Sequence, residues 1–324
     1  MIASVPHRAA GLTLAADRRL PGFVALPADS PSVADVRIHL ETPPSWHAAD
    51  ATRIHTAGAT DQEGRPIVTV SRSRVGFHFA YADGTRAWVD APGTNVWCTW
   101  PAAASLEDTC TYLYGPILGL VLRLRGALAF HASAVQIGGG AVGFAGPHGA
   151  GKSTLAAALA ASGCAVVTDD VLHVRSDGTR WMVEPFASML KLWPEGARLA
   201  LGDRADLPRI AAGWNKRALV PGGRIAAAAT PLPLFALATL APPAATPAIE
   251  PLSAAAALVR LAGNSSAAHL LDSSQRAAEF HALSALVRAV PCVTVTPPLS
   301  SAEYPSFIER VLEWGRTRAS DLSD

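Results

Sequence analysis

The sequence predicts an α/β protein with a phosphate-binding loop in a mixed sheet, preceded by a smaller antiparallel β-rich N-terminal domain. Residues 146–154 form a complete G-x-x-x-x-G-K-[ST] motif between an apolar, strand-like segment at 141–145 and an Ala- and Leu-rich segment at 155–162. Residues 138–140 form a three-glycine turn before this strand, which gives it an antiparallel neighbour. Alternating apolar residues between positions 36 and 97 predict the N-terminal sheet.

Composition limits the function classes. Half of the 324 residues are hydrophobic and the formal net charge is +1, with the basic residues scattered, so we expect no nucleic-acid partner and no membrane partner. The four cysteines lack C-x-x-C spacing and lie in apolar stretches, which favours buried free thiols and a reducing cytoplasm. The most hydrophobic stretch, 112–124, is too short to span a bilayer and predicts a buried helix.

The N-terminal domain is predicted to cover residues 1–104. Its first 30 residues have weak periodicity, and an antiparallel meander, apolar on one face, is expected from these segments: 36–40, 67–70, 75–81, 87–89 and 95–97. Ser105 and Asp108 have the spacing of a capping box, so a connecting helix should begin there and end at Gly126.

Residues 127–324 are predicted to form the catalytic domain. Segment 127–137 pairs back onto the strand that enters the loop. The remaining expected strands are 165–168, 171–175, 180–183, 233–240 and 293–295, and the expected helices are 254–261, 277–290 and 306–316. The Pro- and Ala-rich stretch 241–251 predicts a loop.

The loop defines the ligand class. Its glycines let consecutive N–H groups converge on phosphate oxygens, Lys152 supplies a cation for the β- and γ-phosphates, and Ser153 offers a hydroxyl to Mg²⁺. The expected cofactors are therefore ATP and Mg²⁺. The candidate nucleotide-binding residues are Gly146, Pro147, His148, Gly149, Ala150, Gly151, Lys152, Ser153 and Thr154.

Two adjacent carboxylates follow the loop. Asp169 lies 16 residues after Ser153, at the end of the next predicted strand, where ligands of such sheets bind. Neighbouring residues there point to different sides, so one of Asp169 and Asp170 can reach a metal while the other faces the acceptor. Ordinary turn chemistry is the alternative. His131 starts the strand paired with the loop-entering strand, where it can assist a carboxylate or be a satisfied core histidine.

Lysine usage is unusual. The chain has only three lysines, Lys152, Lys191 and Lys216, against 24 arginines. Where arginine is the default, a lysine more often occupies a position that needs a compact ammonium. Lys152 is therefore expected to be functional, whereas function and chance are equally open for Lys191 and Lys216.

These residues together resemble a known family. The run His131-Ala-Ser-Ala-Val, the loop 15 residues later and Val-Thr-Asp169-Asp170 are similar to the catalytic domain of HPr kinase/phosphorylase. The resemblance implies a P-loop domain of HPr kinase/PEP carboxykinase type and a serine-directed kinase. By position it implies Asp169 as the base, His131 as its assistant, and Lys152, Ser153 and Asp170 on the nucleotide and metal. Because that family forms oligomers, it also implies a homo-oligomer.

A closer resemblance is to HPr-kinase-like proteins encoded with lasso peptide biosynthesis, which phosphorylate a precursor peptide. It covers most of residues 105–300 and is carried by segments 114–119, 190–195, 216–217 and 290–293. The long phosphorylase-signature segment of true HPr kinases is not evident, so the likeness does not extend to reverse phosphorolysis or to HPr as the substrate.

The sequence thus predicts an ATP- and Mg²⁺-dependent kinase acting on a serine of a peptide or protein. Lys191 and Arg217 are candidates to hold the γ-phosphate or the substrate, with solvated loop residues as the equal alternative. Glu184 is a further candidate carboxylate, and Trp193 is interpreted as a packing residue. A small-metabolite kinase with the same site, and a nucleotide-binding switch without transfer, are the competing functions.

Overall fold

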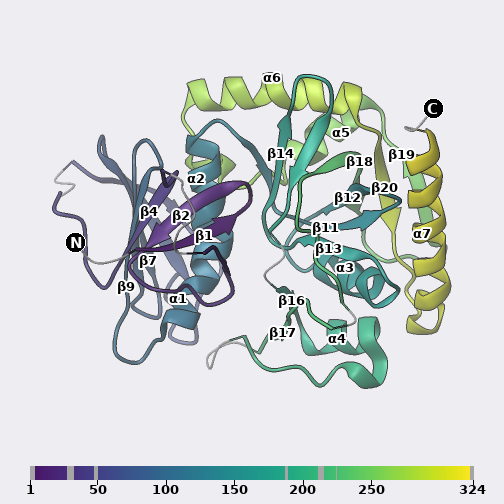
Figure 1. Cartoon of the computed structure of the whole chain (residues 1–324), viewed down its shortest axis with the longest axis horizontal. Coiled ribbons are helices and arrows are strands. Elements are labelled where there is room, and N and C mark those ends of the chain that lie inside the picture. Colours follow the sequence, from purple (N-terminus) through teal and green to yellow (C-terminus); the bar gives the residue numbers. More distant parts are fainter. Residues whose placement is uncertain are drawn as a thin grey trace. The chain divides into compact units, whose positions relative to one another are not determined.

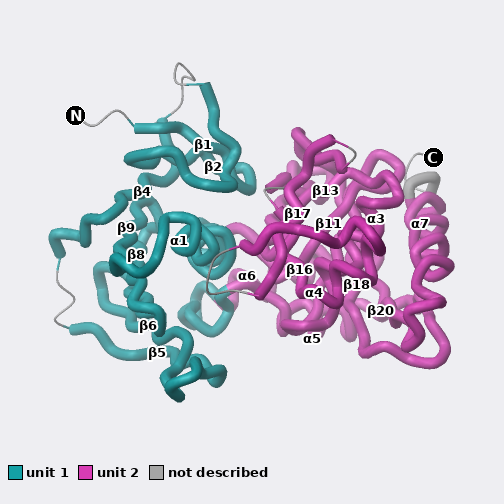
Figure 2. Tube along the Cα trace, turned by 90° about the horizontal axis from the view of Figure 1, so that it is seen from below, with its two compact units in different colours: residues 1–126, 267–275 teal, residues 127–266, 276–324 magenta. Residues whose placement is uncertain are grey.

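A computed structural model of the chain describes residues 4–27, 33–46, 50–186, 189–210, 215–223 and 225–321. The chain divides into two compact units (Figure 2). Unit 1 comprises residues 1–126 with 267–275, and unit 2 comprises residues 127–266 with 276–324. Unit 1 therefore includes a short segment that follows most of unit 2 in the sequence, an assignment that no composition change in the sequence indicates.

Unit 1 contains a nine-stranded sheet in the order β3-β1-β2-β4-β9-β8-β7-β6-β5 (Figure 1). The strands are β1 Val5–Ala9, β2 Leu12–Ala16, β3 Val24–Ala25, β4 Val36–Leu40, β5 Thr52–Thr56, β6 Val68–Arg72, β7 Gly76–Tyr81, β8 Arg86–Asp90 and β9 Asn95–Thr99. The five strands that alternation predicts are present as β4, β6, β7, β8 and β9. From β5 to β9 the pairing is antiparallel throughout.

The prediction of a wholly antiparallel sheet is wrong at β4, which runs parallel to both β2 and β9. Parallel neighbours need a long connection, and here residues 17–35 join β2 to β4 while the whole meander β5–β8 separates β4 from β9. Alternation shows which face of a strand is buried, but it carries no information on strand direction. The weakly periodic first residues also form strands, β1 and β2, which pair with each other.

The predicted connecting helix is present as three consecutive segments. Helix α1 (Leu106–Tyr112) begins with the predicted capping box of Ser105 and Asp108, continues through a wide π-helical turn (Leu113–Ile117) and ends as α2 (Leu118–Leu124). Pro116 lies in the wide turn, where its missing N–H and its ring prevent regular α-helical bonding. In the described part of the chain, no helix has the length and apolarity needed to cross a membrane.

Unit 2 is an α/β unit with a mixed sheet (Figure 1). Strand β12 leads into the glycine-rich loop that the sequence predicts to bind phosphate, here called the phosphate loop. It lies between β11 on an antiparallel side and β18 on a parallel side, and β20 extends the parallel side. The strands are β10 Leu128–Phe130, β11 Ala132–Ile137, β12 Gly140–Ala145, β13 Ala165–Thr168, β14 Leu172–Ser176, β15 Trp181–Glu184, β18 Leu232–Leu240, β19 Ala248–Pro251 and β20 Cys292–Thr296. The antiparallel partner of the loop-entering strand, predicted from the glycine turn, is confirmed.

Helices cover both faces of this sheet. Helices α3 (Lys152–Ala161), α4 (Pro194–Leu201) and α7 (Tyr304–Asp321) pack on one face around Phe144 and Phe307. Helices α5 (Ala254–Ala262) and α6 (Ser273–Ala289) pack on the other face around Phe130 and Leu286. The four cysteines are free and buried, as their apolar surroundings predict.

Three short elements differ from the sequence-based prediction. Residues 248–251 of the expected loop form β19, which pairs with β20, so the loop prediction is wrong at its end. Strands β16 (Leu190–Leu192) and β17 (Arg217–Leu219) form a separate two-stranded sheet that the sequence did not indicate. Such short strands form because a distant partner is available, and local periodicity cannot show that partner.

Candidate functional site

The phosphate loop joins the end of β12 at Ala145 to the start of α3 at Lys152. Gly149 and Gly151 have φ values of +83° and +90°, a region that side chains with a Cβ rarely adopt. Gly151 is the N-cap of α3, so the loop delivers the chain to the helix N-terminus, where N–H groups and the helix dipole favour anions. Lys152 Nζ donates to the carbonyl oxygens of Gly146 at 2.9 Å and Pro147 at 3.0 Å.

Strand β13 ends directly before Asp169 and Asp170. Asp170 has φ +67°, a left-handed conformation that is uncommon for a residue other than glycine. Asp169 is buried, whereas the side chain of Asp170 is 20% exposed and lines a cavity. The two adjacent carboxylates therefore occupy different environments.

Asp169 accepts three hydrogen bonds. Its Oδ1 accepts from the hydroxyls of Ser133 at 2.6 Å and Ser153 at 2.9 Å, and its Oδ2 accepts from the backbone N–H of Lys191 at 2.9 Å. Burial and the negative charge of Asp170 nevertheless raise the pKa of Asp169 above its usual range. The carboxylate lies beside the loop serine and lacks a compensating cation among its hydrogen-bond donors.

Asp170 has the opposite electrostatics. Burial disfavours its charge, but the positive charges of Lys191 and then His131 outweigh burial, and the pKa of Asp170 lies well below its usual range. The largest of these contributions comes from the Lys191 ammonium, which lies 2.6 Å from Asp170 Oδ2. Asp170 is thus ionised and held in place at neutral pH.

His131 lies between β10 and β11, with its backbone N–H bonded to Asn264 O at 2.8 Å. Its Nδ1 is 3.2 Å from the carbonyl oxygen of Asp170, a contact that requires the proton on Nδ1. Burial and the charge of Lys152 lower the pKa of His131. The rings of His131 and His148 are nearly parallel, with centroids 6.4 Å apart. The structure therefore brings His131 to the acidic pair, where it contacts the backbone of Asp170.

A cavity of about 220 Å³ joins these groups. All three lysines of the chain line it, although the chain has 24 arginines. The lining residues are His131, His148, Gly149, Gly151, Lys152, Ser153, Thr154, Asp170, Lys191, Trp193, Glu195, Gly196 and Lys216. The cavity thus combines a phosphate loop, the carboxylates of Asp170 and Glu195, and three ammonium groups.

Two predicted substrate residues lie elsewhere in unit 2. Glu184 is on β15 and forms an ion pair with Arg175 at 2.6 Å, and Arg217 is on β17 opposite Leu192; neither lines the cavity. Conversely, the sequence pattern predicts no role for Ser133, whose hydroxyl contacts Asp169, and it leaves function and chance equally open for Lys216. The rarity of lysine was the signal for Lys216, whereas the position of Ser133 two residues after His131 carried no such signal.

Trp193 is 46% exposed and lines the cavity, so its interpretation as a packing residue is wrong. The ammonium of Lys216 lies 5.4 Å from the centroid of a Trp193 ring, within the range of cation–π attraction.

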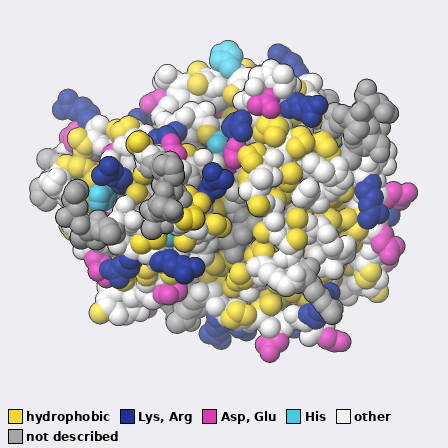
Figure 3. Space-filling model, in the orientation of Figure 1, with side chains coloured by type: hydrophobic (Ala, Val, Ile, Leu, Met, Phe, Trp, Pro, Cys, Tyr) yellow, Lys and Arg dark blue, Asp and Glu magenta, His cyan; other side chains and the backbone are white. Residues whose placement is uncertain are grey.

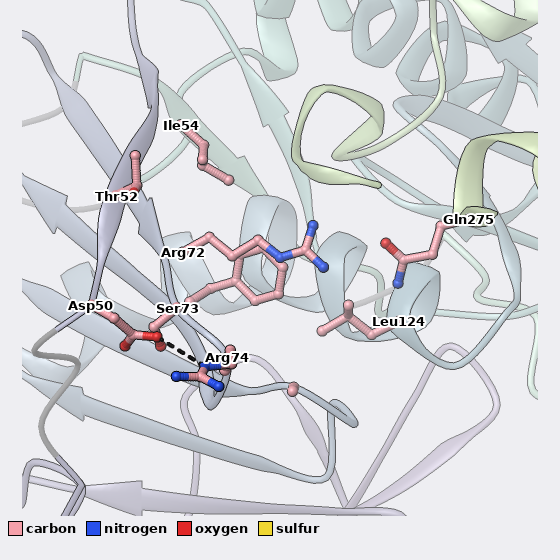
Figure 4. A pocket seen from close by; sticks show the side chains of 10 residues that line it. Asp50, Thr52, Ile54, Arg72, Ser73, Arg74, Leu124 and Gln275 are labelled. Carbon is pink, nitrogen blue, oxygen red and sulfur yellow. Dashed lines mark hydrogen bonds and ion pairs between the residues drawn. The ribbon is translucent and has the colours of Figure 1, made fainter. Parts of the chain in front are cut away.

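A second cavity, of about 550 Å³, lies within unit 1 (Figure 4). Its two arginines each have a carboxylate partner: Arg72 pairs with Asp272 at 3.1 Å and Arg74 with Asp50 at 3.4 Å. Its charges are therefore balanced, and it contains no phosphate loop. On the face of the molecule drawn in Figure 3, basic side chains are interspersed with acidic ones among the residues described.

Comparison with protein-family models gives no match, and comparison with the curated proteins gives none either. Among solved structures, the chain is similar to the Hpr(Ser) kinase/phosphatase from Coxiella burnetii, with 14% sequence identity and a TM-score of 0.31. The similarity covers 59% of this chain and 98% of that one.

Proposed function

We propose that the chain is an ATP- and Mg²⁺-dependent kinase that transfers the γ-phosphate to a serine hydroxyl of a peptide or protein. The observation that carries this proposal is the convergence of a phosphate loop, an ionised carboxylate and all three lysines on one cavity. Phosphoryl transfer needs positioning of the phosphates, cations at the developing charge and a group that accepts the hydroxyl proton. The cavity contains a residue for each requirement.

The nucleotide phosphates are proposed to lie in the loop 146–154, against backbone N–H groups and the N-terminus of α3. Lys152 now donates to two loop carbonyls. Burial is the main cause that lowers its pKa, and the nearby Asp169 and Asp170 oppose that effect. A phosphate in the loop gives this ammonium an anionic partner in place of neutral carbonyl oxygens.

The residues beside Ser153 fit Mg²⁺, which prefers oxygen ligands. Ser153 Oγ and Asp169 Oδ1 lie 2.9 Å apart, and the three hydrogen-bond donors of Asp169 are two hydroxyls and a backbone N–H, none of which carries a charge. We therefore propose Ser153 and Asp169 as the metal-binding residues. The family resemblance implies Ser153 with Asp170 instead, but Lys191 already neutralises Asp170. Bound there, Mg²⁺ would supply neutralisation of phosphate charge.

Asp170 is proposed to accept the proton of the acceptor hydroxyl, a role that the resemblance gives to Asp169. Asp170 lines the cavity, whereas Asp169 is buried behind its three donors. The hydroxyl oxygen bonds to the γ-phosphorus, the bond from that phosphorus to the β,γ-bridging oxygen breaks, the hydroxyl proton passes to Asp170 Oδ, and ADP leaves. Lys191 and Lys216 provide positive charge beside the transferred group, and His131 fixes the backbone of Asp170.

The peptide acceptor is supported by the resemblance to the lasso precursor kinases at residues 190–195, which include the cavity residues Lys191, Trp193 and Glu195. A small-metabolite kinase would use the same phosphate and metal residues. A nucleotide-binding switch without transfer needs neither an ionised carboxylate facing the cavity nor Lys191 beside it.

The test is acceptor-dependent transfer by the purified chain. With Mg-ATP and a pool of serine-containing peptides, we expect phosphoserine by mass spectrometry and ADP release that depends on the peptide. Asp170→Asn should lower transfer by roughly 100-fold while Mg-ATP still binds. Asp206→Asn, an exposed carboxylate outside the cavity, is the matched control and should transfer normally.

Two outcomes would contradict the proposal. In the first, Asp170→Asn phosphorylates the peptide at the full rate, whereas Asp169→Asn binds Mg-ATP normally but no longer phosphorylates the peptide. This result would make Asp169 the base, as the resemblance implies. Mg-ATP binding without peptide-dependent turnover would contradict the peptide acceptor, and absence of turnover with small-molecule acceptors as well would leave only the switch.

A further inference from the structure

Trp193 is a large aromatic side chain that is half exposed at the edge of a charged cavity. Its exposed fraction is 46%, and its neighbours along the cavity wall are polar or charged: Lys191, Glu195 and Lys216. An indole ring gains favourable free energy when an apolar surface covers it, and exposed aromatic rings are typical of recognition surfaces. The ring is therefore available to a ligand that enters the cavity.

The backbone holds this ring in a defined place. Trp193 follows β16, which pairs with β17, and precedes Pro194, the first residue of α4. Its φ of −66° and ψ of 151° lie in the extended region that a following proline enforces. Two residues earlier, the Lys191 ammonium contacts Asp170. The backbone of Trp193 thus lies two residues from the lysine that pairs with the proposed proton acceptor.

Lys216 connects the ring to the charges of the site. Its ammonium lies over a Trp193 ring, and its charge lowers the pKa of His148, of Lys152 and of Asp170, after the larger contributions in each case. The charge of Lys216 therefore reaches two parts of the site, the phosphate loop and Asp170. A phosphate group in the loop is an anion and would attract the Lys216 ammonium more strongly than the neutral Trp193 ring does.

The position of Trp193 relative to the loop indicates which ligand it meets. Lys152 and Ser153 mark the β- and γ-phosphates. Trp193 lines the same cavity as Asp170 and follows Lys191, whose ammonium pairs with Asp170, so the segment that carries the ring lies beside the proposed proton acceptor. A polar small metabolite has no apolar surface to offer there, whereas a residue next to the acceptor serine in a peptide does.

We propose that Trp193 is a specificity-determining residue that binds an apolar or aromatic side chain flanking the acceptor serine of a peptide. This proposal depends on the proposed kinase function. Contact between the two side chains removes apolar surface of both from water, and Lys216 is the cation that covers the ring when no acceptor is present. Trp193 thereby selects the peptide sequence without touching the transferred phosphate.

The experiment uses the full chain, Mg-ATP and synthetic peptides with one serine and randomised flanking positions. Phosphopeptides formed by the wild type should be enriched in Phe, Tyr, Leu, Ile or Met at one flanking position. Trp193→Ala should lose this enrichment, with kcat/KM for the best wild-type peptide lowered about tenfold, mainly through KM. Trp193→Phe should retain the enrichment, and Mg-ADP affinity should be unchanged in both variants.

The matched control is Leu199→Ala, which removes an exposed hydrophobic side chain of the following helix α4 that does not line the cavity. It should behave as the wild type. Phosphorylation of the pool without flanking preference, or an unchanged preference in Trp193→Ala, overturns the role of Trp193 while the kinase function stands. Absence of any phosphopeptide with the wild type overturns both proposals.

Discussion

At the residue scale, the site depends on two neighbouring aspartates with different surroundings. Asp169 is buried among the hydroxyls of Ser133 and Ser153 and the N–H of Lys191, whereas Asp170 reaches the cavity and pairs with the Lys191 side chain. The left-handed conformation of Asp170 permits this difference. Sequence spacing predicts that the two carboxylates face different sides. It cannot predict which one lines the cavity, because that depends on one backbone dihedral.

Ser133 is expected to position Asp169. It is fully buried, and its hydroxyl donates to Asp169 Oδ1 at 2.6 Å. Ser133→Ala removes one of three donors, so we expect kcat to fall about tenfold, as for the loss of one hydrogen bond to a charged group. Ser133→Thr keeps the hydroxyl and should recover most of the rate. Equal kcat in the wild type and in Ser133→Ala would show that Asp169 needs no such support.

Asp90 is predicted to make unit 1 stability pH-dependent. It accepts four hydrogen bonds from Thr94 and Asn95, at 2.7 to 3.0 Å. Burial raises its pKa, but the bonds from Asn95 and then Thr94 outweigh burial, and the net pKa is lowered. A lowered folded-state pKa adds stability above the unfolded value of about 4, and this stability disappears as the pH falls through the folded value.

We therefore expect Asp90→Asn to lower the free energy of unfolding by about 1 kcal/mol at pH 7, since the group is only partly buried. The difference from the wild type should shrink as the pH falls from the unfolded-state pKa through the lowered pKa of Asp90. Urea unfolding at a series of pH values measures it, and a difference that is the same at pH 7 and pH 3 would contradict the assignment.

At the element scale, the strand–loop–helix unit from β12 to α3 was predictable because its signals are local. Glycines mark the turn, Ala and Leu favour the helix, and the three-glycine turn at 138–140 fixes the antiparallel partner. Strands β16 and β17 were not predictable, because Leu190 pairs with Leu219 across residues that carry no periodic pattern. The same limit explains why Trp193 was misinterpreted, since its surroundings are set by that pairing.

Two glycines in strained conformations offer a matched test of the loop. Gly151 and Gly139 both have φ +90°, and at each position a methyl side chain would meet no atom within 4 Å. Gly151 caps α3, whereas Gly139 lies in the β11–β12 turn. Each Gly→Ala change should destabilise unit 2 by about 1–2 kcal/mol. Only Gly151→Ala should also weaken Mg-ADP binding, measured by calorimetry. An equal loss of affinity in both variants would indicate general destabilisation.

At the scale of the whole molecule, the chain consists of two units, and the proposed chemistry belongs to unit 2. The sequence indicated a β-rich N-terminal part and a loop-containing C-terminal part. It did not indicate that residues 267–275 belong to unit 1, because no local feature marks a segment that returns to an earlier unit. The β-rich content of unit 1 was predictable from alternation, whereas the parallel placement of β4 depends on long connections.

Ligand binding should stabilise the protein in a metal-dependent way. Mg-ADP at about 100 times its Kd should add roughly 2.7 kcal/mol to the stability of the unit that binds it. This increase should raise the Tm in calorimetry, and EDTA should remove most of the rise. Asp169→Asn should show little effect of Mg²⁺ on the Tm, while Asp170→Asn should respond as the wild type. If Asp170→Asn loses more of the Mg²⁺-dependent rise in Tm than Asp169→Asn does, the metal would be assigned to Asp170 instead.

The central claim, that the cavity around Lys152 binds a nucleoside triphosphate, is tested most directly by isothermal titration of the full chain with Mg-ATP. We predict binding of one Mg-ATP per chain, and an affinity lowered at least about 100-fold in Lys152→Ala, because the ammonium that faces the phosphates is lost. Absence of binding heat with the folded wild type at several temperatures, or equal affinity in the Lys152→Ala variant, would contradict it.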